Sequence, residues 1–327
     1  MYSIELGARI FHPTSQYMSE FITAANLQTL QFSKEQEDPH CVWDGNSFVF
    51  QQENYTRLGN LKNALSLFWK YSLSPHWISR IGPSIPYSMF PLYDAVRYQN
   101  KIFRNVDDLL YNLEVEGNVF DKSFVQYLID DGYDRDYIED IVDSLLRVRN
   151  PLGIHQKAIS GMFDLHLSNR NSFTIKEGMY SIIDYLQTKS NARVLLNTKV
   201  DSIKLLDSKE IQINYSSNEE LFDIVIIATP LYSSDIQIEG VNYDKWDYTP
   251  IFIQLVLGKL NPSYFNSDIV YHKILTTGKL VDKNENLPFT SILSLGKPKN
   301  NTDYRYYQIT SQQELPNELL NELFIGL

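Results

Sequence analysis

Cysteine is nearly absent from this chain of 327 residues, which contains only Cys41. A single cysteine excludes an intrachain disulfide and a metal centre built from several thiolates. Basic residues are also scarce, since 29 lysines and arginines stand against 40 aspartates and glutamates, for a formal net charge of -11. This balance disfavours a nucleic-acid or anionic-membrane surface, because both surfaces need clustered positive charge.

Long apolar runs are missing as well. A membrane-spanning helix needs roughly 18 or more consecutive apolar residues, and no such stretch occurs. The first residues, Met1-Tyr-Ser-Ile-Glu-Leu-Gly7, lack the basic start and the apolar stretch of a signal peptide. Glycosylation sequons begin at Asn54, Asn214 and Asn300, which is close to chance in so asparagine-rich a chain and gives weak support for secretion.

Paired glycines are a further absence. None of the 14 glycines stands two positions from another, so neither a dinucleotide-binding G-x-G-x-x-G loop nor a phosphate-binding P-loop can be written anywhere. The zinc-protease pattern H-E-x-x-H and the hydrolase pattern G-x-S-x-G are missing too. The residues therefore show no complete catalytic constellation, name no catalytic base and predict no metal site.

The chain does contain a strong strand signal at residues 222–230. Ile224, Val225, Ile226 and Ile227 leave no polar face, which favours a strand covered on both sides in a parallel sheet. Small Ala228 then allows a close approach to the backbone, and Pro230 ends the ladder. Cofactors bind where the strands of open α/β sheets end. The alternative is an ordinary buried strand with a proline stop.

The pattern along the chain predicts an α/β fold in which two domains are interleaved. A partial Rossmann-like cofactor-binding domain takes residues 1–35 and 170–235. An α+β substrate domain takes the rest, with helices in residues 36–169 and an antiparallel sheet in residues 236–327. Residues 1–13 predict two short strands joined by a glycine turn. Apart from these and residues 222–228, the predicted strands are 28–32, 47–51, 172–175, 193–196, 200–206, 211–215, 251–258, 270–275, 289–295 and 305–310.

The helical region has three features of interest. Residues 75–91 form a proline-interrupted stretch, and the aromatic side chains of residues 69–98 line a pocket or belong to the core. Residues 134–149 predict a helix with acidic residues early and arginines late, as the helix dipole prefers. Its acidic residues are expected to form a solvated face. His155 and His166 are each interpreted as structural or surface residues.

Several motifs, taken together, resemble the prenylcysteine oxidase (prenylcysteine lyase) family of flavin amine oxidase-like proteins. The resemblance runs through most of the chain, and its order and spacing carry it. The matching segments are Glu5-Leu-Gly-Ala-Arg-Ile-Phe-His-Pro13, Trp43-Asp-Gly-Asn46, Ser47-Phe-Val-Phe50, Glu177-Gly178, Asp223-Ile-Val-Ile-Ile-Ala-Thr-Pro-Leu231, Val256-Leu-Gly-Lys-Leu-Asn-Pro262 and Ile274-Leu-Thr-Thr277.

The resemblance implies an FAD-dependent enzyme that cleaves the thioether of farnesyl- or geranylgeranylcysteine with O₂. The products would be cysteine, a prenyl aldehyde and hydrogen peroxide, formed during lysosomal breakdown of prenylated proteins. It also implies a glycoprotein of the lysosome or secretory pathway. The cofactor supplies this chemistry, while the protein supplies orientation and an apolar pocket. We expect that pocket between residues 57–167 and 250–310, lined by Phe, Tyr, Leu and Ile.

The same resemblance assigns residues to the cofactor. Gly7, Ala8 and Arg9 would face the flavin and its ribityl chain, and Glu177 and Gly178 would flank the ring. Val200 would meet the adenine through its backbone, and Ala228, Thr229 and Pro230 would line the adenosine side. Glu177 stands where the family has a glycine, and it would add a buried charge or a clash beside the ring.

By this resemblance the chain begins after the family's G-x-G-x-x-G loop and ends before the segment that completes the flavin site. Whether this chain is itself an enzyme is therefore left open. A non-enzymatic, truncated or diverged relative that keeps only an apolar pocket is one alternative. An FAD amine oxidase is another.

Overall fold

The computed structural model describes all residues except 1–6, 8–9, 32–38, 54–55, 98, 100, 106–107, 110–117, 168–171, 242–247, 279–286, 299–302 and 327. The chain forms two compact units, one made of residues 1–185 and 251–327 and the other of residues 186–250. This division differs from the expected domains, because it separates residues 186–235 from residues 1–35 and 170–185.

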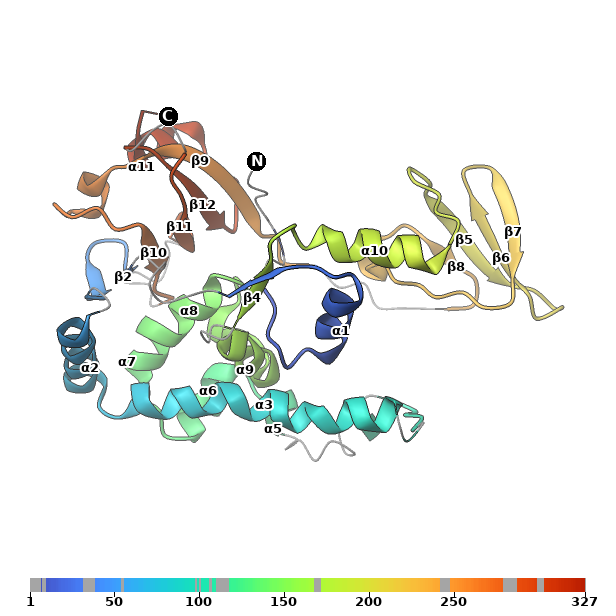
Figure 1. The fold of residues 1–327 in the computed structure, drawn as a ribbon, viewed down its shortest axis with the longest axis horizontal. Coiled ribbons are helices and arrows are strands. Elements are labelled where there is room, and N and C mark those ends of the chain that lie inside the picture. The colour runs from blue at the N-terminus through green and yellow to red at the C-terminus, as the bar shows by residue number, and fades with distance from the viewer. Residues whose placement is uncertain are drawn as a thin grey trace. The chain divides into compact units, whose positions relative to one another are not determined.

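The first unit is built around a seven-stranded sheet with the order β13-β9-β12-β11-β10-β2-β3 (Figure 1). Its strands are β2 (His40–Trp43), β3 (Phe48–Gln51), β9 (Phe252–Leu260), β10 (Lys273–Thr276), β11 (Ser291–Gly296), β12 (Arg305–Ser311) and β13 (Phe324–Ile325). Neighbours pair antiparallel except β10 and β2, which are parallel. The antiparallel strands predicted within residues 251–310 are confirmed.

Alternation along β12 separates the two faces of this sheet. Tyr307 and Ile309 point into a cluster that includes Trp43 and two leucines of α11 (Asn317–Leu323), Leu320 and Leu323. On the opposite face, Leu275 of β10 and Leu293 of β11 pack into a second cluster with the helices. The sheet is therefore buried on one face by α11 and, at its β10–β11 part, on the other face by the helical region.

The helical region covers the part of the chain for which helices were expected. Its elements are α2 (Arg57–Tyr71), α3 (Ser74–Arg97), α5 (Asn118–Asp121), α6 (Phe124–Asp130), α7 (Arg135–Tyr137), the π-helical η2 (Ile138–Val142), α8 (Asp143–Arg147), the 3₁₀ helix η3 (Gly153–His155) and α9 (Ala158–Leu167). Thr56 caps α2, since its hydroxyl accepts from the Gly59 amide at 3.0 Å.

Two expectations about these helices are corrected. The stretch with Pro83, Pro86 and Pro91 is not interrupted but continues as α3, which packs along α9 (Figure 1). Tertiary packing here outweighs the low helix propensity of proline. The acidic residues of 134–149 are not all solvated, because Asp140 and Asp143 are only 4% and 3% exposed.

A small antiparallel pair ties the N-terminal segment to the residues after the helical region. Strand β1 (Thr29–Gln31) pairs with β4 (Phe173–Ile175), and Phe11 adds a bridge to Phe173. Helix α1 (Gln16–Ala24) precedes β1, and α10 (Tyr180–Ser190) follows β4. The structure thus brings the segment before residue 35 into contact with residues 173–175.

The second unit contains a four-stranded sheet with the order β7-β6-β5-β8. Its strands are β5 (Val200–Leu205), β6 (Ile211–Tyr215), β7 (Asn218–Phe222) and β8 (Gln237–Ile238). The strands predicted at 222–228 and 193–196 are wrong, since no strand is formed over 223–230 or 193–196. Ile224 and Ile226 are 79% and 85% exposed. Apolar residues on both faces stabilise a strand only where neighbouring strands pair with it and other elements cover it.

Candidate functional site

A cavity of about 370 Å³ lies within the first unit, between the helical region and the seven-stranded sheet. We call it the sheet–helix cavity. Its lining residues are Gly7, Ile10, Val148, Arg149, Leu167, Ile251, Ile253, Leu293, Gln308 and Thr310. A cavity is therefore present where the substrate pocket is expected, between residues 57–167 and 250–310, and its role as that pocket stays a prediction. Leucine and isoleucine line the cavity as expected, but its described lining includes no phenylalanine or tyrosine.

An apolar strip continues along the same face of the sheet. On β9 and β12, Thr310 lies opposite Ile253, Gln308 opposite Leu255, and Tyr306 opposite Leu257. We call Leu255, Leu257 and Tyr306 the apolar strip; they are 45%, 45% and 38% exposed, respectively. Side chains two residues apart share one face of a strand. The strip therefore extends from the cavity wall as apolar surface that the protein leaves accessible.

The cavity also contains polar side chains. Gln308 Oε1 and Thr310 Oγ1 are buried and have no hydrogen-bond partner among the described residues. Across the lining, Arg149 donates from its guanidinium to the carbonyl of Asp164 at 3.2 Å and to that of Leu167 at 2.9 Å. The cavity thus combines apolar walls, unpaired polar atoms and one fixed positive charge, as small-molecule sites commonly do.

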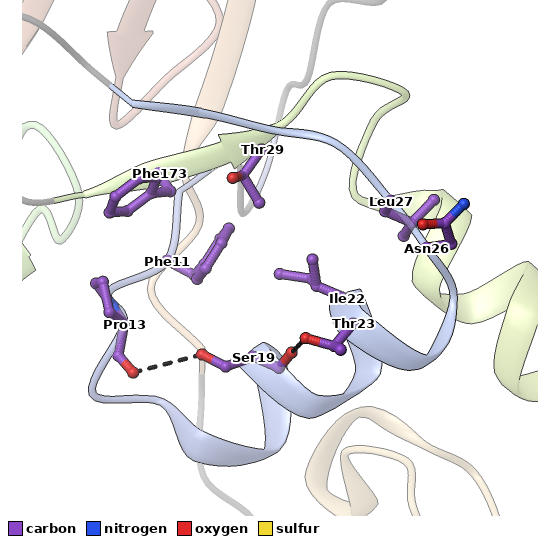
Figure 2. Close-up of a pocket in the computed structure, with 9 residues that line it drawn as sticks. All are labelled: Phe11, Pro13, Ser19, Ile22, Thr23, Asn26, Leu27, Thr29 and Phe173. Carbon is purple, nitrogen blue, oxygen red and sulfur yellow. Dashed lines mark hydrogen bonds between the residues drawn. The ribbon is translucent and has the colours of Figure 1, made fainter.

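A second, more open pocket, of about 420 Å³, is lined by residues of α1, β1 and β4 and of the segments next to them. Figure 2 shows Phe11 and Ile22 pointing into it. Two of its hydroxyls are already used, because Thr23 donates to the Ser19 carbonyl at 2.8 Å and Ser19 to the Pro13 carbonyl at 3.4 Å. Asn26 and Thr29 are the other polar residues of its lining.

Two histidines lie together at the end of α9. The rings of His12 and His166 have centroids 3.9 Å apart. Thr14 Oγ1 lies 2.9 Å from His12 Nδ1 and 3.4 Å from His166 Nε2. The Thr14 amide donates to His12 Nδ1 at 3.2 Å, and burial lowers the pKa of His12, so both features favour the neutral ring. Because 152 residues separate Thr14 and His166, no local pattern in the sequence could reveal this contact.

The predicted ring-binding residues are only partly described. Gly7 lines the sheet–helix cavity, while Ala8 and Arg9 lie outside the described residues. Glu177 is exposed, and its carboxylate accepts from the Gln28 amide at 3.2 Å; its place beside the flavin ring stays a prediction. Gly178 is buried with a φ of 102°, a conformation that glycine adopts without strain.

The predicted adenosine-side residues belong to the second unit. Val200 begins β5 opposite Tyr215. Ala228, Thr229 and Pro230 are exposed and precede the short 3₁₀ helix η4 (Leu231–Ser233). The Pro230 carbonyl accepts from the Ser234 amide at 3.1 Å. Their assignment to the cofactor stays a prediction.

The residues fit one part of FAD and not another. A side chain built at Gly7 would meet no atom of the described residues within 4 Å, so on their side the backbone is open to a flat ring beside apolar Ile10 and Val148. The diphosphate needs backbone amides presented by closely spaced glycines at a helix start. The sequence contains no such pair of glycines.

The described residues contain no cluster of three or more His, Cys, Asp or Glu placed to hold a metal ion. None of the helices in the described part of the chain combines the length and apolar character needed to cross a membrane.

The chain matches curated proteins over most of its length. The mouse protein "Prenylcysteine oxidase 1-like" is 26% identical over 283 residues, which cover 80% of this chain and 54% of that protein. "Farnesylcysteine lyase" of Arabidopsis thaliana is 24% identical over 339 residues, which cover 98% of this chain and 65% of that protein. The chain thus spans between half and two thirds of the length of these relatives.

The fold of the chain also resembles that of a solved structure. A putrescine oxidase variant from a study of cofactor-binding redesign superposes with a TM-score of 0.53 at 13% identity, over 98% of this chain and 69% of the other. The chain accordingly shares the mixed helix-and-sheet fold of that putrescine oxidase. The family model described as prenylcysteine lyase matches residues 56–327. Since this match covers most of the chain, the chain belongs to the prenylcysteine lyase family.

Proposed function

We propose that this chain forms the substrate-binding part of an FAD-dependent thioether oxidase that cleaves prenylcysteines. The observation that carries the proposal is the sheet–helix cavity with its apolar strip, in a member of the prenylcysteine lyase family. A prenyl group is a long hydrocarbon, and its burial is favourable by about 25 cal/mol per Å². Leu255, Leu257 and Tyr306 supply such a surface next to the cavity.

The overall reaction balances as prenylcysteine, O₂ and water giving cysteine, prenyl aldehyde and hydrogen peroxide. FAD would supply the acceptor for the hydride taken from the carbon beside sulfur. The protein's own role is to hold that carbon in place and to keep bulk water from the hydrocarbon. Gly7, Ala8, Arg9, Glu177 and Gly178 are proposed for the ring end of FAD. Val200, Ala228, Thr229 and Pro230 are proposed for its adenosine end.

The two alternatives are separated by different observations. The fixed positive charge of Arg149 in the lining disfavours a bare cationic amine, which argues against amine oxidation. The other alternative, a protein that binds prenyl compounds without flavin, is separated by whether bound ligand is turned over. Lysosomal or secretory placement and glycosylation are part of the proposal by family likeness alone.

The test uses the protein as its gene encodes it, supplied with FAD, O₂ and S-farnesylcysteine. We expect cysteine, farnesal and hydrogen peroxide in equal amounts, measured by thiol titration, chromatography and a peroxidase-coupled assay. Putrescine is the matched amine substrate and should not be consumed. Consumption of putrescine alone would identify an amine oxidase, and tight binding of S-farnesylcysteine without turnover would identify a binding protein.

A further inference from the structure

Three unpaired polar atoms gather on one face of the seven-stranded sheet. They are Ser291 Oγ on β11 and Gln308 Oε1 and Thr310 Oγ1 on β12, and none has a hydrogen-bond partner among the described residues. Ser291 lies directly opposite Thr310 in the ladder, and Gln308 lies two residues along the same face. Their residues are 0%, 8% and 4% exposed. Such groups are rare in folded proteins, and each one requires an explanation.

Two of these residues line the sheet–helix cavity. Gln308 and Thr310 stand among aliphatic neighbours there, with Ile253 and Leu293 directly opposite them on the flanking strands. An amide oxygen only accepts hydrogen bonds, so the atom that satisfies Gln308 Oε1 must be a donor. A hydroxyl accepts as well as donates, so Thr310 Oγ1 can serve the same donor.

We propose that Gln308 and Thr310 bind the α-ammonium group of an S-alkylated cysteine. This inference rests on the proposed function, because it names the residues that orient that substrate. The ammonium group has three donors and suits two neighbouring acceptors. Arg149 on the other side of the lining favours the carboxylate of the same amino acid. The hydrocarbon then extends over the apolar strip, whose first member, Leu255, lies opposite Gln308.

This binding mode explains why one face of β12 is polar near the cavity and apolar farther along the strand. From Thr310 to Gln308 to Tyr306 the same face of β12 changes from polar to aromatic at steps of about 7 Å. A substrate with a charged head and a long apolar tail has the matching order of groups. Gln308 and Thr310 therefore determine which end of the substrate enters the cavity.

The experiment measures equilibrium binding to the protein as its gene encodes it by isothermal titration calorimetry, with its FAD reduced and O₂ excluded so that no ligand is oxidised during the titration. The ligands are S-farnesylcysteine and S-farnesyl-3-mercaptopropionate, which lacks only the amino group. For Gln308→Leu and Thr310→Val we expect binding of S-farnesylcysteine to weaken by about tenfold to a hundredfold, the usual effect of losing a hydrogen bond to a charged group. Binding of the amino-free ligand should change little.

Two further variants serve as controls. Ile253→Ala removes apolar contact and should weaken both ligands alike. Gln308→Glu keeps the shape and the acceptor, so it should retain the preference for the ligand with the amino group even if Gln308→Leu folds poorly. If Gln308→Leu and Thr310→Val weaken binding of both ligands equally, or weaken neither, the inference about the ammonium group is wrong while the proposed function still stands. Failure of the unchanged protein to bind either ligand would overturn the proposed function together with it.

Discussion

His40, the first residue of β2, has an imidazole that burial strongly affects. Burial lowers its pKa from 6.5 to about 4, and the positive charge of Lys273 acts in the same direction. The unfolded chain therefore takes up this proton at a higher pH than the folded chain does. Stability that is present above about pH 6.5 is lost as pH falls toward about 4.

Replacing this histidine should remove that loss. From about pH 7 to pH 4.5, we expect the free energy of unfolding of His40→Gln to fall by about 1–2 kcal/mol less than that of the unchanged chain. Urea unfolding at the two pH values measures the difference. His76→Gln, which replaces an exposed histidine of α3, is the matched control for removing a histidine side chain. Identical pH slopes for His40→Gln and the unchanged chain would contradict the prediction.

The burial of individual polar side chains could not be predicted from the sequence. The acidic residues of 134–149 read as a solvated face, yet Asp140 accepts from the Tyr71 hydroxyl at 2.9 Å and from Lys70 at 3.2 Å. The polar residues Gln308 and Thr310 alternate along β12 as the solvent face of a strand would. Both sets are buried by elements far away in the sequence, and local periodicity carries no information about such cover.

At the scale of elements, the segment 134–149 shows how a distant residue changes a helix. A helix was predicted there, and the structure has one, but residues Ile138–Val142 are π-helical. The Asp143 amide bonds to the Ile138 carbonyl five residues back. The Glu139 carbonyl is left to accept from the Thr277 hydroxyl at 3.0 Å. A side chain inserted into a helical hydrogen-bond ladder is a recognised cause of such irregularity.

This contact predicts a cost for Thr277→Val. The substitution keeps the shape but leaves a carbonyl without its hydroxyl partner, so we expect a loss of about 1–2 kcal/mol in the free energy of unfolding. Thr310→Val is the matched control, because its hydroxyl is buried on the same sheet without a partner in the described structure. That variant should be neutral or slightly more stable. Urea unfolding at one pH compares the two, and equal costs would show that the Thr277 hydrogen bond is unimportant.

Strands were predicted well where the structure supplies partners and poorly where it does not. The runs at 251–258, 289–295 and 305–310 correspond to β9, β11 and β12, whose alternating patterns match a sheet packed on two different layers. The stronger apolar run at 224–227 forms no strand. Composition identifies a segment that can be a buried strand, but a sheet must exist beside it for the ladder to form.

At the scale of the molecule, the predicted interleaving of domains is only partly visible. Residues before 35 do meet residues 173–175, in the β1–β4 pair. Residues 186–250 form a compact unit of their own, so the residues proposed for the two ends of FAD fall in different units. Assembly of one flavin domain from these parts stays a proposal. Residue patterns indicated which segments resemble the family. Long-range packing, which the sequence does not reveal, determines which of these segments belong to the same compact unit.

The chain of 327 residues should not hold FAD tightly by itself. Tight binding of a dinucleotide requires its two phosphate charges to lie over backbone amides at a helix start, with glycines that permit the approach. No two glycines of this sequence stand two positions apart. The other proposed contacts, at Gly7, Val200 and residues 228–230, are mostly backbone or apolar and leave those charges without dedicated donors.

The measurement is the visible flavin spectrum of the purified chain after incubation with excess FAD and passage through a desalting column. We expect less than about a tenth of the stoichiometric flavin absorbance to remain, since a complex without phosphate contacts dissociates readily at low concentration. An equal amount of protein with FAD added after the column gives the stoichiometric reference. A full flavin band that survives desalting would require a second anion-binding site, because the glycine loop that normally performs this role cannot be formed by any segment of the chain.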